Sequence, residues 1–198
     1  MKILVAITGA SGSPYAVSLL KLLKELGHET ETIVSRAAEM VLPLETGLSI
    51  KDLKDLTGRL YFEDEIAAPP ASGSTRYQAM VVIPCTMGTL AAIAHGISKN
   101  LITRAADVTL KERRPLILVV RETPFNRIHL QNMLAANEAG AIIYPAMPAF
   151  YHRPETVMEM VDFFAARVAE FLGLEVENLK RWRGLINVAQ GTYSPRDD

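Results

Sequence analysis

The sequence Ile3-Leu-Val-Ala-Ile-Thr8, which runs directly into Gly9-Ala-Ser-Gly12, decides the fold of this chain. Six apolar or β-branched residues predict a buried strand, and the glycines and serine that follow predict a tight turn. Ser13-Pro14 then opens a helix whose apolar residues recur at helical spacing. In a parallel sheet, such a strand, turn and helix present backbone N–H groups to a phosphate. The stretch therefore predicts a phosphate-bearing ligand at residues 9–12.

The rest of the chain repeats this alternation of strand and helix. We expect further strands at residues 29–34, 79–84, 116–120 and 141–144. We expect helices at residues 13–26, 36–41, 50–56, 86–95, 101–113, 127–139 and 154–173, and a final helical turn at Trp182. Pro43 is expected to end the second helix, and the Pro-, Gly- and Ser-rich residues 58–76 are expected to form a surface excursion.

The alternation predicts an α/β fold, a Rossmann-like (flavodoxin-like) three-layer sandwich with a mostly parallel sheet. No linker divides the chain, so we expect one domain over residues 1–183 and a C-terminal tail at residues 184–198. Ligands of such sheets bind beyond the carboxyl ends of the strands. Those ends carry residues 9–12, Ser35, residues 85–89 and Arg121-Glu122.

Composition excludes several functional classes. The chain is 49% apolar and 22% charged with a net charge of -1, which is typical of a globular protein and gives no bulk attraction for nucleic acid or an anionic membrane. No apolar run reaches the roughly 18 residues of a membrane span, and no secretory signal is recognised. A single cysteine, Cys85, cannot form an internal disulfide, so we expect a cytoplasmic protein.

The turn sequence argues against several nucleotide and metal sites. A nicotinamide dinucleotide site favours Gly-x-Gly-x-x-Gly and an acid at the end of the second strand, whereas this chain has Gly-x-Ser-Gly and Val34-Ser35. No Gly-Lys-Ser/Thr follows the turn as in a P-loop. The histidines are scattered, so no metal is expected. The remaining pattern favours a mononucleotide held by hydroxyl groups.

Six sequence blocks carry a resemblance to a known family. They are Gly9-Ala-Ser-Gly12, Pro84-Cys-Thr-Met-Gly-Thr89, Arg104-Ala-Ala-Asp-Val108, Leu110-Lys-Glu-Arg-Arg-Pro115, Arg121-Glu-Thr-Pro124 and Phe150-Tyr-His-Arg-Pro154. In this order, over residues 1–183, they resemble the UbiX-type flavin prenyltransferases, formerly called 3-octaprenyl-4-hydroxybenzoate carboxy-lyases or phenylacrylic acid decarboxylases.

The resemblance implies a transferase that joins a dimethylallyl group from dimethylallyl phosphate to N5 and C6 of reduced FMN, without a metal. The prenylated FMN would serve a UbiD-type decarboxylase, in ubiquinone biosynthesis or in aromatic-acid breakdown. The family implies a homo-oligomer, a dodecamer with sites at subunit boundaries. Whether the prenyl donor is the monophosphate or the diphosphate stays open.

The resemblance also assigns roles to individual residues. It implies that FMN is bound by Gly9, Ala10, Ser11, Ser35, Thr86, Met87, Gly88, Thr89 and Arg121. It implies that the prenyl phosphate is bound by Arg104, Lys111, Tyr151 and Arg167, and that Glu45, Lys111, Glu122 and Tyr151 are catalytic. Cationic groups and a phenol suit a dianionic leaving group, and a carboxylate, Glu122 or Glu45, suits removal of a flavin proton.

Structural interpretations stand beside these roles. Arg104 and Lys111 lie seven residues apart on one helix and fit a solvated charged face. Arg121 and Glu122 fit an ordinary ion pair, and Arg167 fits a surface or intersubunit position. Cys85 follows a buried strand without a paired histidine, which favours a buried structural thiol over a nucleophile.

Two other functions remain open at this point. Related flavoproteins that oxidatively decarboxylate a C-terminal cysteine share the fold, but they carry Pro-Ala-Ser-Ala-Asn-Thr where this chain has Pro84-Cys-Thr-Met-Gly-Thr89. A non-catalytic FMN carrier would bind flavin and leave Lys111, Glu122 and Tyr151 without a task.

Overall fold

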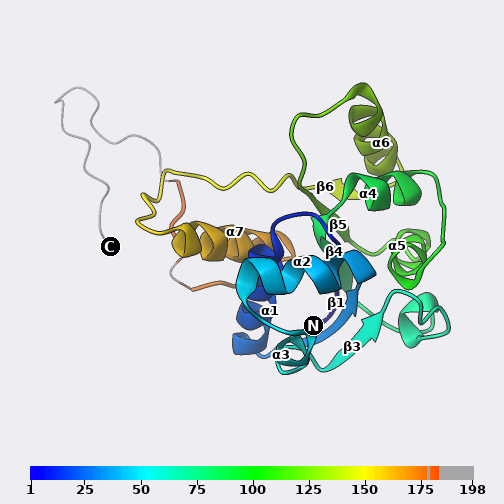
Figure 1. Ribbon diagram of the computed structural model, residues 1–198, viewed down its shortest axis with the longest axis horizontal. Helices are drawn as coiled ribbons and strands as arrows, with labels where there is room; N and C mark the ends of the chain where they lie inside the picture. The colour runs from blue at the N-terminus through cyan, green and yellow to red at the C-terminus, as the bar shows by residue number, and fades with distance from the viewer. Residues whose placement is uncertain (178, 183–198) are drawn as a thin grey trace.

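The computed structural model describes residues 1–177 and 179–182, and its centre is a six-stranded sheet whose paired strands are all parallel. The strands follow the order β3-β2-β1-β4-β5-β6 across the sheet (Figure 1). They span Lys2–Ile7 (β1), Glu29–Val34 (β2), Arg59–Phe62 (β3), Ala79–Cys85 (β4), Leu116–Val120 (β5) and Ile142–Ile143 (β6).

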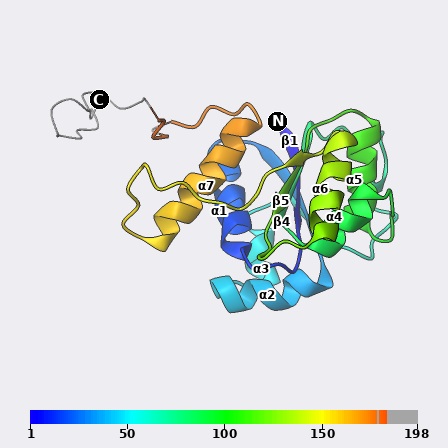
Figure 2. The same cartoon turned by 90° about the horizontal axis from the view of Figure 1, so that it is seen from above.

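Helices cover both faces of this sheet. They span Ser13–Glu25 (α1), Arg36–Thr46 (α2), Ile50–Lys54 (α3), Met87–Ala94 (α4), Leu101–Lys111 (α5), Arg127–Glu138 (α6) and Val157–Phe171 (α7), with a short 3-10 helix at Pro69–Ala71. Figure 2 shows α1 and α7 on one face and α4, α5 and α6 on the other. This arrangement confirms the expected three-layer α/β fold.

Two apolar clusters hold the layers together, because successive side chains of a strand point to opposite faces. On β1, Ile3, Val5 and Ile7 pack with α1, α2 and α7, whereas Leu4 and Ala6 pack with α4, α5 and α6. All five side chains are at most 1% exposed. A strand buried on both faces is apolar at every position, which is why the opening stretch predicts the fold so clearly.

Three expected elements are wrong in detail. Helix α2 continues through Pro43 to Thr46 and ends at Gly47, whose φ of 70° is left-handed, because one proline removes only one hydrogen bond of the helix. The excursion at residues 58–76 contains strand β3, which pairs with β2 and buries Tyr61. Trp182 lies in irregular backbone and not in a helical turn.

Helix α7 begins three residues later than expected. Thr156 caps it by accepting a hydrogen bond from the Glu159 backbone N–H at 3.1 Å. Among the helices of the described residues, none combines the length and apolar character that crossing a membrane requires. The expected tail at residues 184–198 lies outside the described residues.

Candidate functional site

The loops that follow β1 and β4 lie side by side where the strand order reverses. From β1 the chain builds β2 and β3 on one side of the sheet, and β4, β5 and β6 then extend the other side. The loops after β1 and β4 therefore lead to helices on opposite faces, α1 and α4, and in parallel sheets the ligand crevice is expected between two such loops. Residues 9–12 and 86–89, the first and third expected flavin segments, meet at this position.

The first turn of α1 is closed by a carboxylate of the chain itself. Oε2 of Glu45, on α2, accepts hydrogen bonds from the backbone N–H groups of Gly12 at 2.9 Å and Ser13 at 2.8 Å. Burial tends to raise the pKa of Glu45, but these bonds and one from the Ser11 side chain outweigh it and hold the pKa below its ordinary value. Glu45 thus fills the amides at which the sequence predicts a phosphate, and the catalytic role that the resemblance implies for it stays a prediction.

The first turn of α4 is capped differently. Oγ1 of Thr86 accepts a hydrogen bond from the Thr89 backbone N–H at 3.2 Å and donates one to Thr89 Oγ1 at 2.9 Å. The N–H groups of Met87 and Gly88 lie in the first turn, where an α-helix offers no acceptor. A Cβ placed on Gly88 would meet no atom within 4 Å. This helix end is open and suits an anion.

Ser35 and Gly9 are joined through the start of α2. The buried Ser35 hydroxyl caps α2 by accepting a hydrogen bond from the Ala38 backbone N–H at 3.1 Å. A Cβ on Gly9 would lie 2.3 Å from Cβ of Ala37, so the residue must be glycine for α2 to begin there. The first two expected flavin segments are therefore neighbours, with Ala10 in the same turn.

Arg121 and Glu122 follow β5 at the same edge of the sheet. Both side chains are exposed, and the Arg121 backbone N–H donates a long hydrogen bond of 3.4 Å to the Cys85 carbonyl. Burial raises the pKa of Tyr15, and the nearby positive charge of Arg121 opposes that rise. Oε1 of Glu122 accepts from the Thr123 backbone N–H at 3.0 Å, and the described residues show no ion pair between Arg121 and Glu122.

Tyr151 and Arg167 line one pocket of about 350 Å³ between the segment after β6 and α7. Its other walls are Ile143, Tyr144, Pro145, Met147, Ala149, Phe163 and Phe164. The Tyr151 ring meets Phe163 edge-on at 5.7 Å and Trp182 at 5.9 Å between ring centroids. Arg167 donates to Glu170 on the next turn of α7. A cation and the phenols of Tyr144 and Tyr151 thus border a hollow whose remaining walls are apolar, a combination that suits an allylic phosphate.

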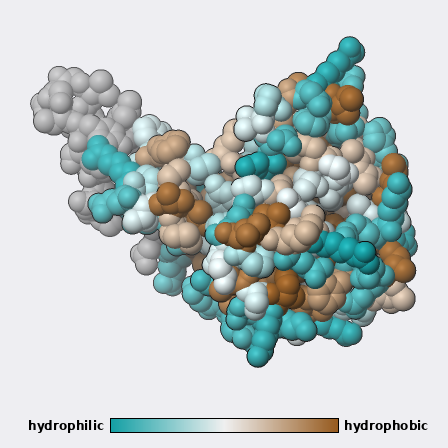
Figure 3. Space-filling model, viewed as in Figure 1, coloured by the Kyte–Doolittle hydropathy of each residue, from teal (hydrophilic) through white to brown (hydrophobic). Residues whose placement is uncertain are grey.

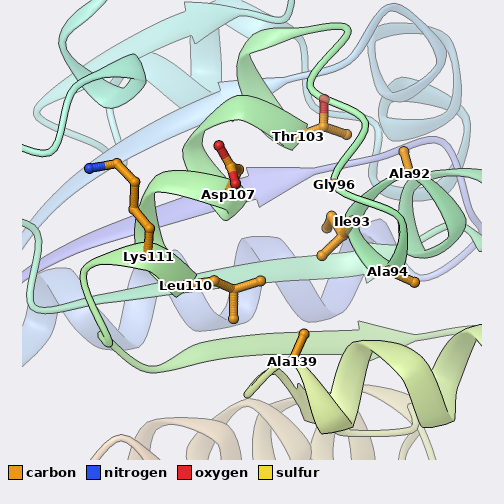
Figure 4. Close-up of a pocket in the computed structure, with 9 residues that line it drawn as sticks. All are labelled: Ala92, Ile93, Ala94, Gly96, Thr103, Asp107, Leu110, Lys111 and Ala139. Atoms are coloured by element: carbon orange, nitrogen blue, oxygen red, sulfur yellow. The ribbon is translucent and has the colours of Figure 1, made fainter.

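Arg104 and Lys111 lie elsewhere in the chain. Nη1 of Arg104 pairs with Asp107 at 2.7 Å, and Lys111 pairs with Glu112 at 2.6 Å. Lys111 ends α5 shortly before β5 begins, at the opposite edge of the sheet from residues 9–12. It borders a hollow of about 370 Å³ between α4 and α5, where its amino group extends away from the apolar wall of Leu110 and Ile93 (Figure 4).

Within the described residues, neither Arg104 nor Lys111 lines the pocket of Tyr151 and Arg167. Sequence reasoning also missed two residues of the site, Tyr15 and Phe163. Phe163 stands four residues before Arg167, so the helical spacing could have placed it on the same face of α7. Tyr15 lies in the first turn of α1, and its ring is 3.2 Å from where a Cβ of Gly12 would lie.

Cys85 has the buried environment expected of a structural thiol. Its side chain is fully buried, and burial raises the pKa of the thiol to about 12. A thiol with this pKa carries almost no thiolate near neutral pH, so it is not a nucleophile.

The fold and this edge of the sheet define a parallel α/β protein with a nucleotide-type site at its switch point. The sequence pattern of the Flavoprotein family matches residues 1–171. Flavin prenyltransferase UbiX of Deinococcus radiodurans is 48% identical over 182 residues, which cover 92% of this chain and 93% of that protein.

Two solved structures are similar over almost their whole length. A dodecameric FMN-dependent UbiX-like decarboxylase from Escherichia coli O157:H7 has a TM-score of 0.90 at 45% identity and covers 93% of this chain and 100% of its own. A UbiX protein (PadA1) in complex with FMN and dimethylallyl pyrophosphate has a TM-score of 0.90 at 41% identity and covers 92% and 97%. The chain belongs to the UbiX-type flavin prenyltransferases within the flavoproteins.

Proposed function

We propose that this protein is a flavin prenyltransferase, which transfers a dimethylallyl group from dimethylallyl phosphate to N5 and C6 of reduced FMN. The observation that carries the proposal is the pocket in which Tyr151 and Arg167 face apolar walls. A phosphate needs the cation and the phenol, and a five-carbon allyl group needs the apolar walls. Relatives of this chain are named for this activity, and the resemblance in sequence implies the same reaction.

The residues of the switch point fit FMN. The open first turn of α4, with Thr86, Met87, Gly88 and Thr89, offers amide and hydroxyl donors to an anion. Residues 9–11 and Arg121 border the same crevice, and Ser35 lies beside Gly9 through the start of α2. β2 ends at Val34-Ser35 without the acid that would bind a dinucleotide ribose. Reduced flavin supplies the nucleophilic atoms when it is bound.

The side chains of the chain serve the leaving group and the proton. As the allylic C–O bond breaks, positive charge develops on the dimethylallyl group and the phosphate leaves as a dianion. Arg167 stabilises that dianion, and the Tyr151 hydroxyl donates a hydrogen bond or a proton to it. Closing the new ring releases a flavin proton to a carboxylate.

Glu122 is the better candidate for that base. Hydrogen bonds from residues 11–13 already converge on the Glu45 carboxylate and lower its pKa, which weakens it as a base. Glu122 is exposed at the end of β5, and among residues 1–177 and 179–182 it accepts only a local hydrogen bond, from Thr123. Glu45 then shapes the turn at residues 11–13.

A homo-oligomer, in the family a dodecamer, completes the substrate site in this proposal. Arg104 and Lys111 of one copy then reach Tyr151 and Arg167 of another, because neither cation lines that pocket within the described residues of one chain. Exposed apolar side chains support association, among them Met40 at 67% and Leu44 at 85%. Figure 3 shows apolar areas set among polar ones on the face that α2 covers.

The prenylated flavin passes to a UbiD-type decarboxylase, and we place the protein in the cytoplasm. The single buried thiol and the absence of disulfide chemistry support a reducing compartment. A peptidyl-cysteine decarboxylase is disfavoured by Pro84-Cys-Thr-Met-Gly-Thr89, and a mere FMN carrier leaves the pocket of Tyr151 and Arg167 unexplained.

Anaerobic mass spectrometry tests the proposal. Incubation of the protein with reduced FMN and dimethylallyl phosphate should give a flavin heavier by one dimethylallyl group, and the diphosphate is tested in parallel. Arg167→Gln should slow product formation, whereas Arg127→Gln, an exposed arginine at the start of α6, should not. Recovery of unmodified FMN that had been bound would overturn the proposal.

A further inference from the structure

Thr8 is a buried polar residue with no role in the proposed reaction. It follows β1 directly and is 2% exposed. Its hydroxyl donates a hydrogen bond of 2.7 Å to the Pro84 carbonyl and accepts one of 2.9 Å from the Thr86 backbone N–H. One side chain just after β1 therefore bonds to the backbone on both sides of Cys85.

The two hydrogen bonds of the Thr8 hydroxyl form a bridge that lies where the regular backbone pairing of β1 and β4 ends. The regular register ends at the pair Ala6 and Val82, and the pairing of β4 with β5 shifts before Cys85. Pro84 has no N–H to donate, so the strand cannot continue its ladder there. The Thr8 hydroxyl provides both a donor and an acceptor at this point, and the Thr8 backbone N–H adds a weaker bond of 3.3 Å to the same Pro84 carbonyl.

The bridge ends on the residue that starts α4. Thr86 is the N-cap of α4, and its hydroxyl accepts from the Thr89 backbone N–H. The first turn of α4 is thus fixed to the end of β1, one residue before Gly9. The spacing between the open amides of α4 and the turn at residues 9–12 depends on this hydroxyl, because no backbone hydrogen bond between β1 and β4 reaches beyond Pro84 in the described residues.

We propose that Thr8 is a positioning residue for flavin binding. Its hydroxyl holds the first turn of α4 at the distance from residues 9–12 that FMN requires, without touching the flavin. The inference rests on the proposed function, because the proposed function assigns FMN to this crevice. It predicts that losing the hydroxyl weakens FMN binding more than it slows turnover with FMN saturating.

Thr8→Val tests this, since valine keeps the shape and removes both hydrogen bonds. We expect the Kd for FMN, measured by flavin fluorescence on the full chain, to rise about tenfold, the effect of one partly buried amide left unpaired. We expect kcat with saturating FMN and dimethylallyl phosphate to change less than about twofold. Thr8→Ser keeps the hydroxyl and should stay within about twofold of the unmodified Kd.

Thr32→Val is the matched control. Thr32 is a fully buried threonine of β2 whose hydroxyl bonds to Thr57 at 3.0 Å, away from the crevice. Thr32→Val should lower the free energy of unfolding by about as much as Thr8→Val does, and it should leave the Kd for FMN unchanged. If Thr8→Val does not fold, Thr8→Ala removes the same hydroxyl with less bulk and gives the same comparison.

The outcomes distinguish a failure of the proposed function from a failure of the role assigned to Thr8. If the unmodified protein binds no FMN, the proposed function fails. If it binds FMN and Thr8→Val binds it equally well, the role of Thr8 is wrong and the proposed function stands. An equal loss in Thr32→Val, or in Thr8→Ser, would also overturn the role of Thr8, because general destabilisation or lost packing would then explain the effect.

Discussion

Oε2 of Glu45 lies 2.8 Å from the backbone nitrogen of Ser13 and accepts its hydrogen bond. A side chain of α2 thereby occupies the first turn of α1, the position at which the sequence predicts a phosphate. At the neighbouring helix end of the switch point, that of α4, the described residues place no such carboxylate. The two helix ends that flank the crevice therefore differ in charge. The carboxylate of Glu45 neutralises the N-terminus of α1, whereas the N-terminus of α4 is open.

Glu45→Gln should remove a pH-dependent contribution to stability. Because the folded-state pKa of Glu45 is lowered, its carboxylate stabilises the fold above its ordinary pKa of 4.5, and this contribution is lost as the pH falls through the folded-state pKa. Urea denaturation at pH 7 should show the variant less stable by about 1 kcal/mol. The difference should shrink between about pH 5 and pH 3, where the carboxyl becomes protonated and resembles the amide.

Glu39→Gln is the control for this measurement. Glu39 lies on the same helix, and its carboxylate accepts no hydrogen bond from the described residues. Its substitution should leave the pH dependence of unfolding unchanged. A Glu45→Gln variant that kept the full pH dependence would show that the contact with the first turn of α1 contributes nothing to folding.

Gly9→Ala and Gly88→Ala should separate folding from flavin binding. A methyl group at Gly9 would lie 2.3 Å from Cβ of Ala37, so α2 must shift, at a cost of about 2 kcal/mol in the free energy of unfolding. Gly88 has open space around it and lies in the first turn of α4, so its alanine variant should fold at least as well as the unmodified protein. Thermal unfolding and FMN titration of both variants measure the two effects.

Gly88→Ala should still weaken FMN binding, because it adds a methyl group in the first turn of α4, beside the open amides proposed to bind the flavin. Normal FMN affinity in Gly88→Ala would place the flavin away from the first turn of α4. Unchanged stability in Gly9→Ala would mean that α2 can move freely relative to the turn.

Glu31 should be the most costly acidic residue to remove. Its carboxylate is mostly buried on β2, pairs with Lys2 Nζ at 2.8 Å and accepts hydrogen bonds from the hydroxyl groups of Tyr61 and Tyr77. Burial favours a raised pKa for Glu31, but these partners outweigh it and the pKa is lowered. Glu31→Ala leaves two buried hydroxyl groups without their acceptor, and Lys2 keeps only its pair with the exposed Glu29, so the free energy of unfolding should fall by about 3 kcal/mol.

Glu29→Ala provides the comparison within the same strand. Glu29 also pairs with Lys2, at 2.9 Å, but its side chain is 60% exposed, so its loss should cost less than about 0.5 kcal/mol. Urea denaturation of both variants at pH 7 tests the difference. Equal effects would show that the buried hydroxyl groups find other partners.

The sequence predicted those parts of the fold that depend on burial. β1 from Ile3 to Ile7 and all of β5 are apolar because helices cover both faces, and β5 was predicted residue for residue. β3 was missed because it is a four-residue edge strand in which only Tyr61 is buried. Its sequence therefore shows no strong alternation of apolar and polar residues. Pro43 was expected to end α2, but one missing N–H does not end a helix that packs well against its neighbours.

The site was predictable only in part, for a related reason. Parallel strands place their carboxyl ends together, so residues 9–12 and 86–89 could be joined from the sequence. The contact of Glu45 with Ser13 links residues that no periodicity connects. The position of Lys111 at the opposite edge of the sheet follows from the direction of α5, which the order of strands and helices in the sequence also predicts. The proposed approach of Lys111 to another copy depends on assembly and leaves no local pattern in the sequence.

Glu122→Gln should show whether Glu122 acts as the base that removes the flavin proton or serves to bind the flavin. The glutamine oxygen can still accept the hydrogen bond that Glu122 now takes from the Thr123 backbone N–H, so the loop after β5 should keep its conformation. We expect FMN affinity within about twofold of the unmodified protein and ring formation slowed about 100-fold or more, the usual effect of losing a general base. Single-turnover reactions, quenched and followed by the mass and absorbance of the flavin, measure the step directly.

Glu138→Gln, an exposed acid at the end of α6, controls for the loss of one negative charge. It should react at the unmodified rate. If Glu122→Gln instead loses FMN affinity and closes the ring normally once FMN is saturating, Glu122 binds the flavin and the proton goes to another carboxylate. Glu45→Gln in the same assay then decides whether that carboxylate is the one held by the first turn of α1, because the hydrogen bonds that lower its pKa should make it a slow base.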